Sequence, residues 1–352
     1  MSATSGLRAA IGNTPLIRLD ALSEATGCEI FGKAEFMNPG GSVKDRAALG
    51  IIEAAEQDGR LKPGGTIVEG TAGNTGIGLA MVGHTRGYRA KIVIPDTQAR
   101  EKMDLLRALG ATVIAVPAAP YSDEGNFNHV ARRLAEETPG GFWADQFDNM
   151  ANAEQHYRTT GPEIWAQTKG QVNAFVTAVG TGGTLAGVSR FLKEKNSGVR
   201  VVCADPYGTV IHCHVKHGKL EFDDGDSVTE GIGQGRLTKN FAAARIDECF
   251  KVTDPAMMEM LEHLLRVEGL FMGSSAALNV VGAVQQALEG GPGQTIVTVL
   301  CDGGGRYLSK IWNPEWRANA GLVPRGLATG ALVELIRRTP RHEHVPPSLR
   351  LP

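Results

Sequence analysis

Short runs rich in β-branched residues alternate with helical stretches along most of this 352-residue chain. The expected strands are 28–35, 66–69, 90–94, 111–116, 173–179, 199–204 and 295–300. The expected helices lie between them, at 42–58, 74–86, 99–109, 125–137, 184–195, 254–267 and 276–289. Alternation of this kind predicts an α/β fold with mainly parallel, twisted sheets that helices cover on both faces. We therefore expect two three-layer domains with a ligand cleft between them.

The pattern divides near the middle of the chain. We expect the N-terminal α/β domain at 40–150, and we expect residues 1–39 to join 151–325 in the C-terminal α/β domain. The pattern alone leaves this boundary open, because residues 1–35 could pack with either half.

Two segments depart from the alternation. Residues 206–244 have weak periodicity and many turn-forming residues, so we expect a long functional excursion there. Residues 326–352 form an expected C-terminal extension, whose proline-rich part at 340–352 is expected to be poorly ordered.

Composition excludes several classes of function. The formal net charge of −2 gives no global field that would recruit nucleic acid or an anionic membrane. No segment reaches the roughly 20 apolar residues of a membrane helix, and no secretory signal is visible. The five cysteines are dispersed, and His212-Cys213-His214 lacks a second ligand group, so we expect no metal site. Reduced thiols in the cytoplasm fit this pattern best.

A glycine turn precedes a helix at 38–46 (NPGGSVKDR). Ser42 is the expected N-cap, which places Lys44 in the first turn. The helix macrodipole is positive there, so the dipole and burial would both lower the pKa of the Lys44 ammonium. Such a lysine suits Schiff-base chemistry. On this motif alone, an exposed lysine without a chemical role fits equally well.

A first glycine-rich loop follows the strand that ends at Glu69 and opens a helix near Asn74. Backbone N–H groups at such a turn bind a carboxylate or a phosphate, and Asn74 could donate to a ring oxygen. The glycine spacing differs from the dinucleotide fingerprint, which argues against a nicotinamide site. Asp96 follows the next strand at a suitable distance, so this alternative is not excluded. A purely structural turn is the remaining alternative.

A second loop, Val179-Gly180-Thr181-Gly182-Gly183-Thr184, also follows an apolar strand and precedes a helix. Its backbone N–H groups and hydroxyls suit a terminal phosphate, and because no Gly-Lys-Ser/Thr follows, a phosphate monoester fits best. The two loops and the lysine together require a ligand with a phosphate, a carbonyl and an amino-acid carboxylate. Pyridoxal phosphate condensed with an amino acid meets all three requirements.

From about Ile11 to about Pro314 the sequence resembles the cysteine synthase (O-acetylserine sulfhydrylase) and cystathionine β-synthase family. These are pyridoxal-phosphate enzymes of the tryptophan-synthase-β-like fold, fold type II. The resemblance rests on eight segments: Asn13-Thr14-Pro15-Leu16, the Lys44 segment, the Asn74 loop, Gln146-Phe147, Thr159-Thr160-Gly161-Pro162-Glu163-Ile164-Trp165, the Gly180–Thr184 loop, Glu230-Gly231-Ile232-Gly233 and Arg306-Tyr307-Leu308-Ser309.

The resemblance implies a role for each matching residue. Lys44 would carry pyridoxal 5′-phosphate as a Schiff base and then act as the base on the substrate α-carbon. Asn74 would bind the ring oxygen, and Ser275 would meet the pyridine nitrogen or cap the helix that follows. The phosphate would rest on Gly180, Thr181, Gly182, Gly183 and Thr184. The substrate would be bound by Thr71, Ala72, Gly73, Asn74, Thr75, Gln146 and Gly231.

The resemblance also implies an activity. The favoured reaction is β-replacement of O-acetyl-L-serine by sulfide through an aminoacrylate, giving L-cysteine and acetate. Cystathionine β-synthase, acting on serine and homocysteine, and cysteine desulfhydrase or serine dehydratase are alternatives within the chemistry. A binding partner of serine acetyltransferase is the alternative from another class. A homodimer is expected.

Closure around the substrate is also implied. Residues 90–135 are expected to form a mobile subdomain. Free and substrate-bound crystals with this segment in one position would contradict that expectation. The chain departs from most relatives at Ala72, where they have serine, and at Cys301-Asp302-Gly303-Gly304-Gly305, where they have a segment rich in proline and serine.

Overall fold

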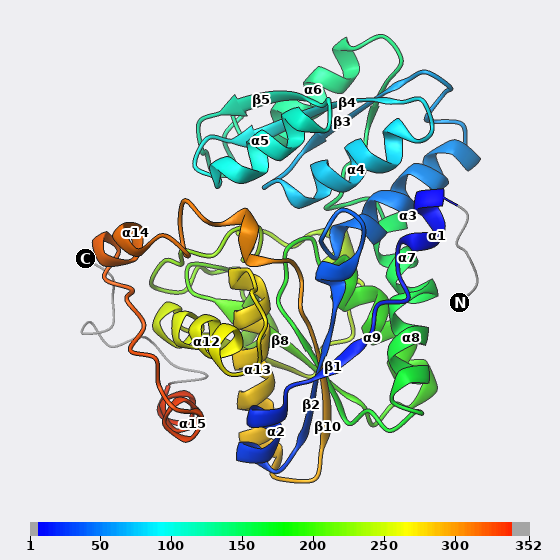
Figure 1. Cartoon of the computed structure of the whole chain (residues 1–352). Coiled ribbons are helices and arrows are strands. Elements are labelled where there is room, and N and C mark those ends of the chain that lie inside the picture. Colours follow the sequence, from blue (N-terminus) through cyan, green and yellow to red (C-terminus); the bar gives the residue numbers. More distant parts are fainter. Residues whose placement is uncertain (1–5, 340–352) are drawn as a thin grey trace.

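The larger of two sheets holds six strands in the computed structural model, which describes residues 6–339 (Figure 1). Their spatial order is β1 (Leu16–Arg18), β2 (Glu29–Lys33), β10 (Thr295–Val299), β7 (Ala174–Thr177), β8 (Arg200–Pro206) and β9 (Glu248–Val252). β1 pairs with β2 in antiparallel fashion, and the other neighbouring strands pair in parallel. The predicted α/β class with mainly parallel sheets is confirmed.

The smaller sheet has the order β5 (Thr112–Val116), β4 (Arg89–Pro95), β3 (Thr66–Gly70) and β6 (Gly141–Trp143), and all its pairs are parallel. Because side chains alternate along a strand, β4 contributes side chains to the apolar clusters on both faces of the sheet. Ile92 packs with α4 (Asn74–His84) and α5 (Arg100–Ala108), whereas Val93 packs with α6 (Phe127–Glu137). Figure 1 shows the helices on either side of this sheet.

The larger sheet alternates in the same way. Val176 and Val202 face a cluster formed with α12 (Asp254–Arg266) and α13 (Ser274–Gly290). Phe175 and Val201 face the opposite cluster, formed with α8 (Thr160–Gln167) and α9 (Gly183–Lys195). Helices thus cover both faces, which is the three-layer arrangement that the pattern predicts.

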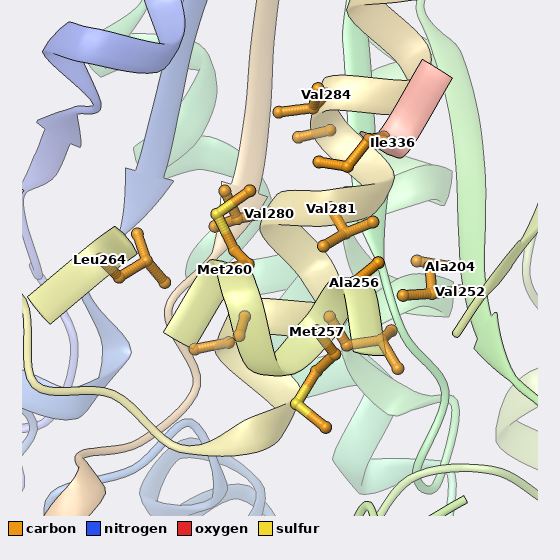
Figure 2. Close-up of a cluster of buried hydrophobic side chains, with 14 of the residues drawn as sticks. Ala204, Val252, Ala256, Met257, Met260, Leu264, Val280, Val281, Val284 and Ile336 are labelled. Carbon is orange, nitrogen blue, oxygen red and sulfur yellow. The ribbon is translucent and has the colours of Figure 1, made fainter. Parts of the chain in front are cut away.

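Helix α15 (Thr329–Arg338) lies within the predicted C-terminal extension. It packs on α12 and α13, which cover the larger sheet; this sheet and its covering helices form the larger domain. Leu332 and Ile336 are fully buried. Figure 2 shows Ile336 in one apolar cluster with Met260 and Val284. Burial of each such side chain stabilises the fold by about 1.5–3 kcal/mol, so residues 329–338 belong to the core. The predicted tail at 340–352 lies outside the described residues.

Each expected strand and helix is present, with its ends moved by a few residues. Further elements were not expected: α1 (Gly6–Ala10), α2 (Asp20–Thr26), η1 (Glu35–Met37), α7 (Ala151–Arg158), α8, α10 (Ile211–His217), α11 (Lys239–Ala242), η2 (Gly304–Arg306), α14 (Pro314–Asn319), α15, β1, β6 and β9. The excursion at 206–244 holds two short helices, α10 and α11, between turns. None of the helices within residues 6–339 combines the length and hydrophobicity needed to span a membrane.

A buried group of charges fixes the start of α3 (Lys44–Gln57). Arg46 Nε lies 2.8 Å from Glu35 Oε2, and its Nη1 lies 2.7 Å from Glu163 Oε1. Lys33 Nζ lies 2.6 Å from Glu163 Oε2. The two cations are fully buried. Because these residues come from β2, η1, α3 and α8, the group joins the first turn of α3 to the larger domain.

This group predicts a pH dependence of stability. Burial raises the pKa of Glu163, but hydrogen bonds and charge from Arg46 and Lys33 outweigh it and lower the pKa from 4.5 to about 2. Ionised Glu163 therefore stabilises the fold above about pH 4.5, and this contribution is lost as pH falls toward about 2. The wild type should therefore lose unfolding free energy as pH falls from about 4.5 toward 2. In Glu163→Gln we expect this loss to be smaller by on the order of 2 kcal/mol.

Urea unfolding at pH 5.5 and pH 3 measures this difference. Glu136→Gln is the matched control, because Glu136 is 63% exposed and pairs only at the surface with Arg132. Glu163→Gln losing as much stability as the wild type between these pH values would contradict the assignment.

Candidate active site

A cavity of about 450 Å³ opens at the carboxyl ends of β3 and β7. Ligands commonly bind at this edge of parallel sheets. The structure brings most of the predicted site residues together there: Lys44, Thr71, Ala72, Asn74, Thr75, Gln146, Gly180, Thr181, Gly182, Thr184, Gly231 and Ser275 line the cavity. Gly73 and Gly183 lie within the two loops but are not among the lining residues. Asp96 is exposed and lies outside the lining.

Lys44 is the first residue of α3. The predicted N-cap at Ser42 is wrong by one residue, since Val43 holds that position. Ser42 forms an isolated bridge with Asp302, while its Oγ still accepts from the Lys44 backbone N–H at 3.2 Å. The Lys44 amine makes no hydrogen bond or ion pair with the other residues of 6–339. It is therefore available to a ligand in the cavity.

Hydrogen bonds hold the 71–75 loop at the end of the smaller sheet. Thr71 Oγ1 accepts from the Gly73 N–H at 3.0 Å, and Gly73 has a φ of 127°, which favours glycine. Thr75 donates to Gln146 Oε1 at 2.5 Å, and Gln146 Nε2 donates to the Gly70 carbonyl at 3.0 Å. Gln146 thus holds the loop in place. The N–H groups in the first turn of α4 have no partners within the helix, so they are available to a ligand.

Asn74 has partners that the sequence did not predict. Its Nδ2 donates to Asp302 Oδ2 at 2.7 Å, and its Oδ1 accepts from Arg306. Tyr307 donates to the same Asp302 oxygen at 2.7 Å. Since an amide nitrogen carries two hydrogens, Asn74 keeps one donor for a ligand. The sequence did mark the segment Cys301–Gly305, because it differs from the family pattern. The contact between Asp302 in this segment and Asn74 was not predicted.

The 180–184 loop approaches neighbouring backbone so closely that glycine is required. A Cβ on Gly180 would lie 2.4 Å from the Gly231 carbonyl oxygen, and one on Gly182 would lie 2.5 Å from the Phe241 nitrogen. Gly182 also has a φ of 88°. This loop opens α9, a 13-residue helix, so free N–H groups and the positive end of the helix dipole meet at the cavity. The loop fits a phosphate.

Neutral groups form the wall around Ser275. Ser275 is buried in the first turn of α13, whose N-cap is Gly273, so the alternative of Ser275 as the N-cap is wrong. Burial outweighs the charge of Lys44 and a hydrogen bond from Ser275, which both lower the pKa of the neighbouring Cys301 thiol, and raises that pKa to about 11. A neutral hydroxyl and a neutral thiol therefore line this side.

Gly231 lies opposite Ala72: a Cβ on Gly231 would be 3.6 Å from the Ala72 Cβ.

A buried ion pair joins α5 to the larger domain beside the cavity. Lys102 Nζ lies 2.6 Å from Glu230 Oε2, and Lys310 Nζ lies 2.6 Å from Glu230 Oε1. Burial lowers the pKa of Lys102 and raises that of Glu230, but the charge and hydrogen bond of Lys102 outweigh burial at Glu230 and lower its pKa. Lys102 was not among the predicted site residues, because a single lysine within a helix gives no sequence signal.

An available amine and two glycine-rich loops that each open a helix at one cavity suit an aldehyde cofactor with a phosphate. Comparison with known proteins agrees. The family model described as "Pyridoxal-phosphate dependent enzyme" matches residues 7–302. The chain belongs to this family, and its cofactor is pyridoxal 5′-phosphate.

Individual relatives narrow the resemblance. The chain is 53% identical to cysteine synthase 1 of Neurospora crassa, covering 90% of this chain and 86% of that protein. It is 47% identical to cysteine synthase of Dictyostelium discoideum, covering 89% and 85%. The structure is similar to an O-acetylserine-dependent cystathionine β-synthase from Helicobacter pylori, with a TM-score of 0.79 and 32% identity over 88% of this chain and 99% of that chain. The predicted family and fold are confirmed.

Proposed function

We propose that this protein is a cysteine synthase, which replaces the acetate of O-acetyl-L-serine with sulfide to give L-cysteine. The observation that carries the proposal is the cavity, whose lining includes Lys44, the 180–184 loop and Ser275. The Lys44 amine has no hydrogen bond or ion pair within residues 6–339. The relatives named cysteine synthase in Neurospora and Dictyostelium, which match over most of their length, support the same reaction.

Lys44 would hold the cofactor covalently and, once released by the substrate amine, would take the proton from the substrate α-carbon. A placed base of this kind contributes about 10²–10⁴-fold. Pyridoxal phosphate, when bound, supplies an electron sink for the bonds at the α-carbon. Asn74 would hold the cofactor's ring oxygen. The 180–184 loop would hold its phosphate.

Two further features suit elimination of a β-substituent. A hydroxyl at Ser275 does not favour a protonated ring nitrogen as a carboxylate would, so less charge is drawn into the ring and the leaving group departs readily. The substrate carboxylate would bind Thr71, Ala72, Gly73, Asn74 and Thr75. Closure of residues 90–135, supported by the Lys102–Glu230 pair, would exclude water, which otherwise diverts the substrate to acetate, pyruvate and ammonia.

An assay that pairs two donors with two acceptors tests the reaction. We expect O-acetylserine with sulfide to give a kcat/KM at least about 100-fold above that of serine with homocysteine. The reverse preference would favour a cystathionine β-synthase that acts on serine. A preference for O-acetylserine with homocysteine would favour the activity in the name of the Helicobacter pylori neighbour, an O-acetylserine-dependent cystathionine β-synthase. Pyruvate as the main product, with sulfide present, would favour a desulfhydrase or dehydratase and contradict the proposal.

A homodimer, a cytoplasmic location and a complex with serine acetyltransferase complete the proposal. The five free cysteines support a reducing compartment. Light scattering of the purified protein measures its mass, and a monomer would contradict the dimer. Capture of serine acetyltransferase by Lys44→Ala protein would support binding in addition to catalysis.

A further inference from the structure

Helix α7 lies directly behind the 180–184 loop. Two glycines of α9, Gly183 and Gly187, permit this approach. A Cβ on Gly183 would lie 2.1 Å from Asn152 Oδ1, and one on Gly187 would lie 2.2 Å from the Ala153 carbonyl oxygen. Real Cβ contacts are not this short, so the packing depends on both glycines.

Two polar residues on α7 face the loop. Asn152 and His156 are four residues apart, so they share one face of the helix. Each is 1% exposed. Asn152 Nδ2 donates to Thr181 Oγ1 at 2.9 Å, and His156 Nε2 lies 3.2 Å from Thr184 Oγ1. Each of the two threonine hydroxyls in the 180–184 loop therefore has a partner on α7.

The bonds at Thr181 fix the direction of its hydroxyl hydrogen. Its Oγ1 accepts from Asn152 and from the Gly183 N–H at 3.2 Å. A hydroxyl has two acceptor positions and one donor hydrogen. Because both acceptor positions are filled from within the protein, the hydrogen is left for a ligand in the cavity.

At Thr184 the direction depends on the proton of His156. Burial lowers the pKa of His156 well below its ordinary value, and the charges of Arg46 and Lys44 lower it further despite Glu163, so the ring is neutral. Its Nδ1 lies 2.8 Å from Thr160 Oγ1. With the proton on Nε2, the ring donates to Thr184 and leaves that hydroxyl hydrogen for the cavity. With the proton on Nδ1, the ring accepts from Thr184 and turns the hydrogen away.

We propose that Asn152 and His156 are positioning residues that point the hydroxyl hydrogens of Thr181 and Thr184 at the cofactor phosphate, with His156 held as the Nε2–H tautomer. This inference rests on the proposed role of residues 180–184 as the phosphate site. A phosphate dianion offers only acceptors, so a hydroxyl that donates to it stabilises it, whereas one turned away presents lone pairs to its charge.

Two substitutions of His156 separate this role from simple packing. A glutamine amide nitrogen reaches the position of Nε2, whereas an asparagine amide nitrogen reaches only that of Nδ1. We expect His156→Gln to bind pyridoxal phosphate within about threefold of the wild type, and His156→Asn to bind at least about tenfold more weakly. The dissociation constant is measured by absorbance after adding the cofactor to cofactor-free protein, and circular dichroism verifies that each variant is folded. Equal affinities for the two variants would overturn the inference.

A double-mutant cycle tests the coupling to Thr184. Thr184→Val should weaken cofactor binding, and His156→Asn should add less than about twofold to the loss in that background. Fully additive losses would overturn the inference. If Thr184→Val bound the cofactor as tightly as the wild type, the proposed phosphate site would itself be wrong, which distinguishes that failure from this one.

Nitrogen-15 spectra of histidine-labelled protein report the tautomer directly. The His156 signals are identified by their absence in His156→Asn. We expect a protonated Nε2 and an unprotonated Nδ1 when the cofactor is bound, together with a phosphorus-31 shift that stays constant across neutral pH. A protonated Nδ1 would overturn the inference. Asn152→Ala combined with Thr181→Val follows the same cycle for the other hydroxyl.

Discussion

Lys44→Ala is expected to lower kcat/KM for O-acetylserine and sulfide by at least about 10³-fold. The substitution removes both the covalent attachment of the cofactor and the base that moves the α-proton, while leaving the 71–75 and 180–184 loops intact. The purified variant should still bind the cofactor reversibly, and gel filtration should remove it. Steady-state assays at matched cofactor occupancy measure the loss.

Other lysines provide a contrast. Lys33, Lys102 and Lys251 are buried, but each is paired with a carboxylate, so their amines are committed within the protein. Lys62 is exposed and serves as the matched control: Lys62→Ala should retain activity within about twofold of the wild type. Activity of Lys44→Ala within tenfold of the wild type would contradict the assigned role.

Arg46→Ala is expected to reduce the unfolding free energy by about 3–5 kcal/mol. The change leaves Glu35, which is fully buried, without its cation, and it removes two bonds from Glu163. Arg46→Lys should recover only part of the loss, since an ammonium cannot reproduce the forked contacts of a guanidinium. Urea unfolding of the cofactor-loaded protein measures both.

Arg100→Ala is the control for this experiment. Arg100 pairs with Asp104 at the surface and its side chain is 81% exposed, so the expected change is below about 1 kcal/mol. If Arg46→Ala cost no more than Arg100→Ala, the buried charges would not stabilise the start of α3.

Local motifs were sufficient to predict that the two glycine loops and Lys44 lie at helix starts, because each depends on residues that are contiguous in sequence. Helix α7 was missed for a physical reason. Its buried residues are Asn152, Ala153 and His156, so it lacks the apolar periodicity by which a packed helix is identified. Asn152 and His156 contact the 180–184 loop. The polar residues that hide the helix from a search for apolar periodicity are therefore the ones that contact this loop.

Partners far apart in sequence were also missed. Asn74 and Asp302 are 228 residues apart, and Lys102 and Glu230 are 128 apart, so only the fold brings them together. The Ser42 cap was displaced to Val43 because Ser42 bridges to Asp302, a contact that no local preference indicates. Segments β1 and β6 have three residues each, too few to show alternation.

Borohydride reduction of the purified, cofactor-loaded protein, followed by peptide mapping, tests the central claim most directly. We expect a yellow protein whose reduced pyridoxyl label maps to the peptide that contains Lys44, with the buried Lys33 and Lys102 unlabelled. A colourless protein that takes up no pyridoxal phosphate, or a label on a different lysine, would contradict it.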